Sequence, residues 1–276
     1  MLLKKFAGLQ LLFFRKFNIF GLDAPLVAVL WHELIECEFK LQINPEFKII
    51  LFLSVWLAYS ADRYLDDNNI FLKKKLQARH LIFKNKPFEF YFIWIILFTT
   101  AAALTVIYFR RLEIYISLIL LILVILNQVI SIFESKKLNK NILKPFRTSI
   151  ILTIGCFIYP ILHLKHYDYS FIYFPILLCI VFLGNCMAVN KLKSAHYDTS
   201  HSPILINKYI IIIFLFVLLG LCLLGLTPFA IAAFLSVSSI PLIFFKSKIS
   251  YDDRRVILDQ IFWVIPLIVL FLSFAC

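Results

Sequence analysis

The sequence lacks the features that organise disulfide-rich, zinc-binding and multidomain proteins. Its six cysteines include no Cys-x-x-Cys pair or other metal-like spacing, and most fall inside apolar runs. They are therefore interpreted as small apolar fillers rather than disulfide partners or metal ligands. No Gly/Ser-rich linker divides the chain, and the longest polar segment, residues 66–87, leaves no room for a separate soluble domain.

Long apolar runs take up most of the chain. Hydrophobic residues make up 62% of it, and its mean hydropathy is +0.91, well above the apolar share of an ordinary soluble domain. Windows of about 17 to 25 apolar residues predict an all-α, polytopic membrane bundle with about nine transmembrane helices. The predicted helices are 18–36, 47–65, 88–108, 112–133, 147–164, 171–190, 208–225, 228–245 and 257–275.

The net charge of +12 indicates topology rather than nucleic-acid binding. With the N-terminus in the cytoplasm, nine helices place 23 of the 28 lysines and arginines inside, as the positive-inside rule requires. The C-terminus is then expected to lie outside. If the protein is bacterial, the membrane is expected to be the inner membrane. Charged residues interrupt the first 20 positions, so no cleavable signal peptide is expected and the first spanning helix is expected to direct insertion.

Acidic residues appear abruptly at the end of the second predicted helix. Asp62 and Asp66 are four residues apart, so on a helix they share one face with their Cβ atoms about 5 to 6 Å apart, where two anions repel each other. A divalent cation between them relieves this repulsion. Mg²⁺ takes one or two carboxylates and completes its shell with water and phosphate oxygens. The pair therefore predicts a phosphorylated substrate at the cytoplasmic face.

A weaker polar cluster ends the sixth predicted helix. It contains Asn190, Ser194 and Asp198, about 132 residues after the first cluster. The chain is interpreted as one integral domain, 1–276, with two pseudo-repeat halves, about 18–133 and 147–245, and a last helix, 257–275. Two such halves would bring the polar clusters to opposite sides of a central cavity.

The stretch Ala58-x3-Asp62-Arg63-x2-Asp66 resembles the first aspartate-rich motif of the UbiA-type membrane prenyltransferases, Asn-x3-Asp-x3-Asp. In that family this motif ends the second of nine helices, and a second Asp-x3-Asp motif ends the sixth. The basic segments 143–148 and 79–81 also resemble family segments. Two positions depart from the pattern: Ala58 replaces the asparagine, and Ser194 replaces an acid of the second motif.

The resemblance implies Mg²⁺-dependent transfer of an isoprenyl group from a polyprenyl diphosphate to a hydrophobic acceptor, expected to be aromatic, within the membrane. Asp62, Asp66 and Arg63 would be catalytic, and Asp62, Asp66 and Asp198 would hold the metal. The diphosphate would be bound by Arg79, Lys144, Arg147, Asn190 and Asp198. The expected partners are these two substrates and membrane lipid, with no nucleic acid and no obligate protein partner.

Other interpretations stay open. The two departures favour a catalytically inactive relative that keeps the fold and binds lipid or a protein partner, because a fold alone does not fix an activity. A CDP-alcohol phosphotransferase also uses membrane-face aspartates, but it requires a glycine directly after the second acid. The acids could also form a simple solvated helix end paired with Arg63 and the following lysines. His32, Glu36 and Glu38 are likewise interpreted as the residues of a solvated helix end.

Overall fold

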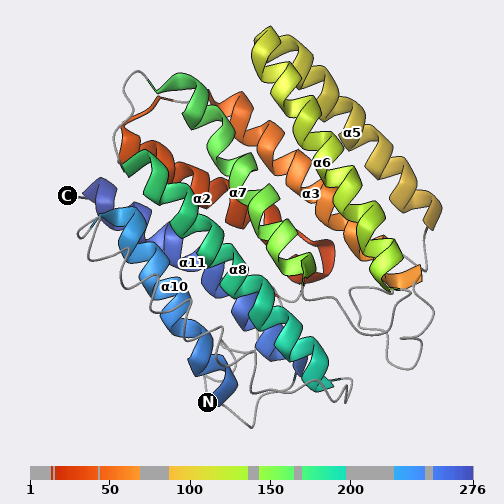
Figure 1. Cartoon of the computed structure of the whole chain (residues 1–276), viewed down its shortest axis with the longest axis vertical. Helices are drawn as coiled ribbons and strands as arrows, with labels where there is room; N and C mark the ends of the chain where they lie inside the picture. The colour runs from red at the N-terminus through yellow and green to blue at the C-terminus, as the bar shows by residue number, and fades with distance from the viewer. Residues whose placement is uncertain are drawn as a thin grey trace. The chain divides into compact units, whose positions relative to one another are not determined.

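In a computed structural model of the chain, the structure describes residues 14, 16–42, 44–68, 87–135, 143–164, 170–196, 227–245 and 251–275. Every regular element in these ranges is an α-helix, which confirms the all-α prediction for them (Figure 1). The helices are α2 (Asp23–Phe39), α3 (Pro45–Asn68), α5 (Pro87–Tyr108), α6 (Arg111–Ser135), α7 (Leu143–His163), α8 (Ser170–His196), α10 (Pro228–Phe245) and α11 (Tyr251–Ala275). Each overlaps one predicted helix; the predicted helix 208–225 lies outside the described residues.

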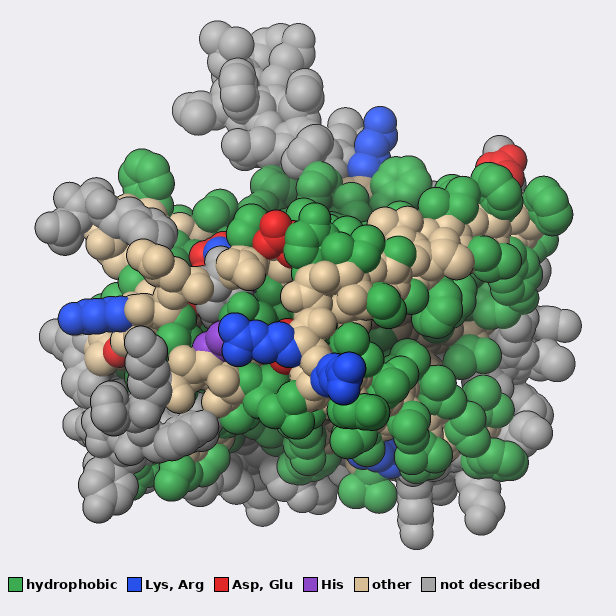
Figure 2. Space-filling model, turned by 90° about the horizontal axis from the view of Figure 1, so that it is seen from above, with side chains coloured by type: hydrophobic (Ala, Val, Ile, Leu, Met, Phe, Trp, Pro, Cys, Tyr) green, Lys and Arg blue, Asp and Glu red, His purple; other side chains and the backbone are tan. Residues whose placement is uncertain are grey.

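Among the described residues, five segments are long and apolar enough to cross a membrane. They are Pro87–Tyr108, Arg111–Phe133, Leu143–His163, Ile172–Leu192 and Asp253–Ser273, and the apolar segment Pro228–Pro241 is shorter. On the face that Figure 2 shows, hydrophobic side chains outnumber charged ones among the described residues. The chain is therefore a membrane-spanning helical protein, whereas the expected count of nine spans stays a prediction.

Contacts divide the chain into two compact units. The first unit comprises Met1–Val29 with Asn44–Lys144, and the second comprises Leu30–Ile43 with Pro145–Cys276. The boundaries fall inside α2 and within the first turn of α7.

In the first unit, α3 packs against both α5 and α6. Phe47, at the beginning of α3, stacks on Phe109, just after α5, with 5.8 Å between ring centroids. Tyr64, near the end of α3, stacks on Phe90 at the beginning of α5, also at 5.8 Å. The two helices are therefore antiparallel, as alternating membrane spans require.

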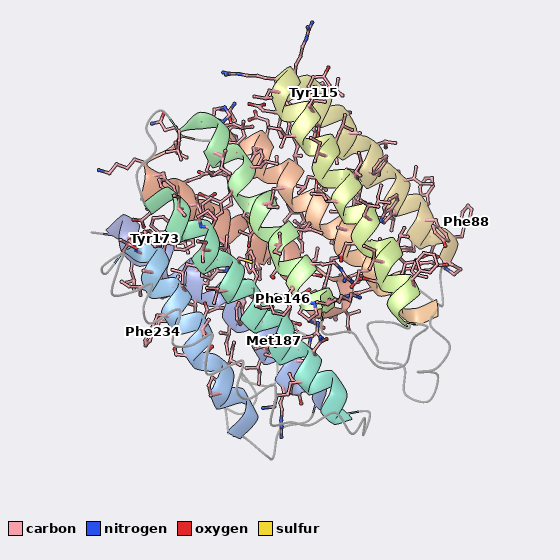
Figure 3. All side chains as sticks on the ribbon, viewed as in Figure 1. Phe88, Tyr115, Phe146, Tyr173, Met187 and Phe234 are labelled. Carbon is pink, nitrogen blue, oxygen red and sulfur yellow. The ribbon has the colours of Figure 1, made fainter. Side chains whose placement is uncertain are left out.

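The α5–α6 pair carries most of the exposed large hydrophobic side chains of this unit. A connection of two residues, Phe109 and Arg110, turns the chain back, and the Glu113 carboxylate accepts the Arg110 backbone N–H at 2.8 Å. Phe88 and Tyr115 point outward at opposite ends of the pair, 82% and 64% exposed (Figure 3). Aromatic side chains at both ends of an apolar helix pair are typical of the two membrane interfaces.

In the second unit, α8, α10 and α11 pack against one another. α10 begins at Pro228, a residue suited to a first helical turn, and the Thr227 hydroxyl accepts the Ala230 N–H at 3.2 Å as a helix cap. Phe174, near the beginning of α8, contacts Phe39 at 5.3 Å and Phe229 at 4.8 Å between ring centroids. The end of α2 thus lies beside the beginnings of α8 and α10.

Candidate functional site

The predicted acids Asp62 and Asp66 lie near the end of α3, one helical turn apart. Asn44 and Pro45 begin this helix, and the helix continues through the acids to Asn68. The Asp62 carboxylate is 26% exposed and forms an ion pair with the Lys144 ammonium at 2.8 Å. Of Asp66, the structure describes the helical backbone only.

Neighbouring helices fix the turns that carry these acids. On α6, the Gln128 amide donates to the Ala58 carbonyl at 3.1 Å, an interhelical hydrogen bond of the kind that polar side chains form between membrane helices. On α5, the Tyr91 hydroxyl donates to the Tyr64 hydroxyl at 2.5 Å. The Ala58 position, where the family motif has asparagine, is thereby joined to α6 through its backbone.

Arg63 faces a different set of groups from Asp62. Its guanidinium donates to the Asn18 carbonyl at 2.7 Å and to the Tyr59 hydroxyl at 2.8 Å, and it lies 3.6 Å from the Asp23 carboxylate. It also lies 4.3 Å from the centroid of the Tyr59 ring, in cation–π geometry. The residue is only 4% exposed.

The turn at Gly21 lies close against the Arg63 guanidinium. Gly21 has a φ of +70°, a conformation that favours glycine, and a Cβ there would lie 3.4 Å from the Arg63 guanidinium. The Asn18 amide donates to the Asp23 carboxylate at 3.0 Å. These contacts account for the burial of Arg63 by its attachment to residues 18–23, so its catalytic role stays a prediction.

The remaining predicted residues fall in two groups. Arg147, on α7, and Asn190, on α8, belong to the second unit, and both are partly exposed. Arg79 and Asp198 lie outside the described residues. Asp62 and Lys144 are therefore the predicted pair that the structure brings into contact.

The donors near the end of α3 are chemically suited to Mg²⁺. Within the described part of the chain, no three His, Cys, Asp or Glu side chains gather closely enough to form a metal site by themselves. Mg²⁺ does not require such a cage, because one or two carboxylates suffice when substrate phosphate and water complete its shell. A partly exposed Asp62 with Asp66 one turn away meets this requirement.

A second polar cluster, in the second unit, differs from its sequence interpretation. His32 is fully buried, its Nδ1 lies 2.8 Å from the Cys156 carbonyl oxygen, and its Nε2 lies 2.9 Å from the Glu36 carboxylate. The expectation of a solvated helix end is wrong for Glu36, which is 7% exposed. Ionisable residues four apart within an apolar run were the available signal, since such residues are functional candidates by default.

Glu38, beyond the predicted span, lies at the beginning of α10. Burial raises the pKa of its carboxyl, while hydrogen bonds from the Phe229 backbone and the Thr227 side chain lower it. A carboxylate at a helix N-terminus is favoured by the helix dipole. This arrangement explains Glu38 as a structural residue that joins α2 to α10.

Comparison of the chain with known protein families, with curated proteins and with solved structures gives no match.

Proposed function

We propose that this chain is a membrane-embedded transferase that moves an isoprenyl group from a polyprenyl diphosphate to a hydrophobic acceptor, which we expect to be aromatic. The supporting observation is the Asp62–Lys144 pair near the end of α3, one turn from Asp66. A carboxylate pair with a lysine against it supplies both metal ligands and a cation for phosphate. The resemblance of residues 58–66 to a UbiA-type motif gives the reaction class.

In this proposal the reaction begins with departure of the diphosphate. The bond between the prenyl carbon and the diphosphate oxygen breaks, and its electron pair leaves with the diphosphate. The acceptor then forms a bond to the prenyl carbon and loses a proton. Lys144 would donate to the departing oxygens, and Arg79 and Arg147 would add positive charge, because fixed cations stabilise charge that develops in the transition state.

Asp62 and Asp66 would hold Mg²⁺, which when bound supplies further neutralisation of the diphosphate. Asn190 and Asp198 would bind the same substrate. Arg63 would position the end of α3 by holding it to residues 18–23. Topologically, the site would face the cytoplasm, with the N-terminus inside and the C-terminus outside.

A second candidate is a catalytically inactive membrane protein that binds lipid or a protein partner. It is favoured by the same ion pair, because Lys144 already neutralises Asp62 without a metal. It is also favoured by Ala58 and Ser194, which replace polar family residues. The two candidates differ in whether the acids near the end of α3 bind diphosphate.

The deciding experiment measures binding of labelled geranylgeranyl diphosphate to the full chain in detergent, with and without Mg²⁺. We expect Mg²⁺-dependent binding that is lost in the Asp62→Asn, Asp66→Asn double variant. The matched control is Asp67→Asn, the same chemical change one position further along α3, which should bind like the unaltered chain. Undiminished binding by the double variant would contradict the proposed site.

A measurement of diphosphate release distinguishes the transferase from the inactive membrane protein. Mg²⁺-dependent release of diphosphate from geranylgeranyl diphosphate by the purified chain, abolished in the double variant, supports the transferase. Lipid or partner binding without diphosphate release supports the inactive relative.

A further inference from the structure

A proline inside α7 lacks the N–H that would pair a carbonyl of the same helix, and α2 places a donor at that carbonyl. Pro160 has no N–H to donate to the carbonyl four residues earlier, at Cys156. The His32 Nδ1 lies 2.8 Å from that oxygen. Because a carbonyl can only accept, His32 must carry a proton on Nδ1.

The neighbouring residue on α2 does the same for α11. Pro266 lies inside α11, which leaves the Phe262 carbonyl without its helical donor. The Trp31 indole N–H donates to that oxygen at 3.1 Å. Trp31 and His32 therefore both have orientations fixed by proline-freed carbonyls, as expected where a nonpolar environment offers no water to compensate.

The position of the proton on His32 Nδ1 determines which group of the ring faces the Glu36 carboxylate. With its proton on Nδ1, a neutral His32 presents the lone pair of Nε2, and this atom lies 2.9 Å from the Glu36 carboxylate oxygen. Two acceptors at this distance repel each other unless a proton lies between them. We propose that His32 and Glu36 together bind one proton in the core of the second unit, so that the pair is neutral as a whole.

Burial makes this proton an integral part of the fold. His32 is fully buried and Glu36 is 7% exposed. An unpaired carboxylate in such a place is strongly unfavourable, whereas a proton shared with imidazole removes the net charge. Releasing the proton would leave the Glu36 carboxylate charged and facing the lone pair of Nε2. This inference concerns a different cluster from the proposed transferase site and does not depend on it.

The elements of the second unit carry other ionisable groups as well. On α2 these are Glu33 and Glu38, both partly exposed. On α7 the Cys156 thiol is buried, on α8 there is Lys191, and on α11 Arg255 is paired with Asp259 at 3.1 Å. Glu33 is the closest in sequence, so its substitution tests whether any α2 acid would give the same effect.

The test is nitrogen NMR with infrared spectroscopy of the full chain in detergent. If one proton lies between the two side chains, the spectra should show either a doubly protonated His32 ring or a protonated Glu36 carboxyl. Glu36→Gln should remove this signature, because the glutamine amide can donate to Nε2 without binding a proton.

Glu33→Gln is the matched control and should keep the signature of the unaltered chain. If Glu36→Gln does not fold, the spectra of the unaltered chain decide by themselves. A neutral His32 ring beside an ionised Glu36 carboxylate would overturn the proposal.

Discussion

At the scale of single residues, Arg63 is a buried cation whose partners come from two stretches of chain. We expect Arg63→Ala to lower the free energy of unfolding by about 3 kcal/mol or more, because Asp23, 5% exposed, would lose its cation. Arg63→Lys should restore only part of this loss. A single ammonium cannot reproduce the guanidinium fork that reaches both the Asn18 carbonyl and the Tyr59 hydroxyl.

Denaturant unfolding in detergent measures these differences. The control is Arg110→Ala, which removes an exposed cation and should change stability by no more than about 0.5 kcal/mol. If Arg63→Ala proves as stable as the control, the contacts of Arg63 do not hold residues 18–23 to α3.

Replacing Lys144 should weaken diphosphate binding and leave the stability of the fold nearly unchanged. Its side chain and that of Asp62 are 20% and 26% exposed, so their ion pair should contribute less than about 1 kcal/mol. We therefore expect Lys144→Met to fold normally but to bind geranylgeranyl diphosphate at least about tenfold more weakly, since a charge-assisted hydrogen bond to phosphate is lost.

Binding and unfolding measured on the same preparation check this expectation. Lys48→Met, the same change at the other end of α3, is the control and should leave both quantities unchanged. Unchanged binding by Lys144→Met would remove lysine from the proposed substrate site.

At the scale of elements, the Trp31–Phe262 hydrogen bond joins α2 to the turn of α11 in which Pro266 has no backbone N–H. Trp31→Phe leaves the Phe262 carbonyl without a donor and should cost about 1 to 3 kcal/mol. In a Pro266→Ala background, the restored backbone N–H can pair that carbonyl within α11, so the same change should cost less.

A double-mutant cycle measured by unfolding isolates this effect, because the change in side-chain volume is the same in both backgrounds. We expect an interaction energy of at least about 0.5 kcal/mol. Strictly additive effects would mean that Trp31 does not compensate for the missing N–H of Pro266.

Helix positions were predictable from sequence because each apolar run is a local property of the chain. Predicted 88–108 and observed Pro87–Tyr108 differ by one residue at the beginning, while α11 begins six residues earlier than predicted, in the polar stretch around Arg254. The positions of Pro160 and Pro266 in the sequence identify the carbonyls four residues earlier, but they do not identify which side chains donate to those carbonyls. Whether His32 reaches Cys156, 124 residues away, depends on how helices pack.

The contacts of Asp62 and Arg63 show the same difference: spacing along one helix can be predicted from sequence, whereas contacts between distant segments cannot. The four-residue spacing of Asp62 and Asp66 on one helix is local and was predicted correctly. That Lys144 contacts Asp62 while Arg63 turns to Asp23 depends on the tertiary placement of residues 18–23 and 144. Adjacent charges in sequence therefore gave no guide to which cation neutralises the acid.

At the scale of the whole molecule, the positive-inside pattern predicts which side of the membrane each connection faces. The two-residue turn at Phe109 and Arg110 should lie outside, and the basic segment after α6, which contains Lys137, should lie in the cytoplasm. In a chain depleted of reactive cysteines, Arg110→Cys should react with an impermeant maleimide added to intact cells. Lys137→Cys should react only after permeabilisation.

Helix geometry gives this test its control. α6 runs from Arg111 to Ser135, about 37 Å at 1.5 Å per residue, which exceeds the roughly 30 Å hydrocarbon core of a bilayer. Two cysteines at its opposite ends must therefore report opposite sides if α6 crosses the membrane. Labelling of both from outside would show that α6 does not cross, and reversed labelling would place the proposed Asp62 site on the outer face, away from a cytoplasmic supply of diphosphate.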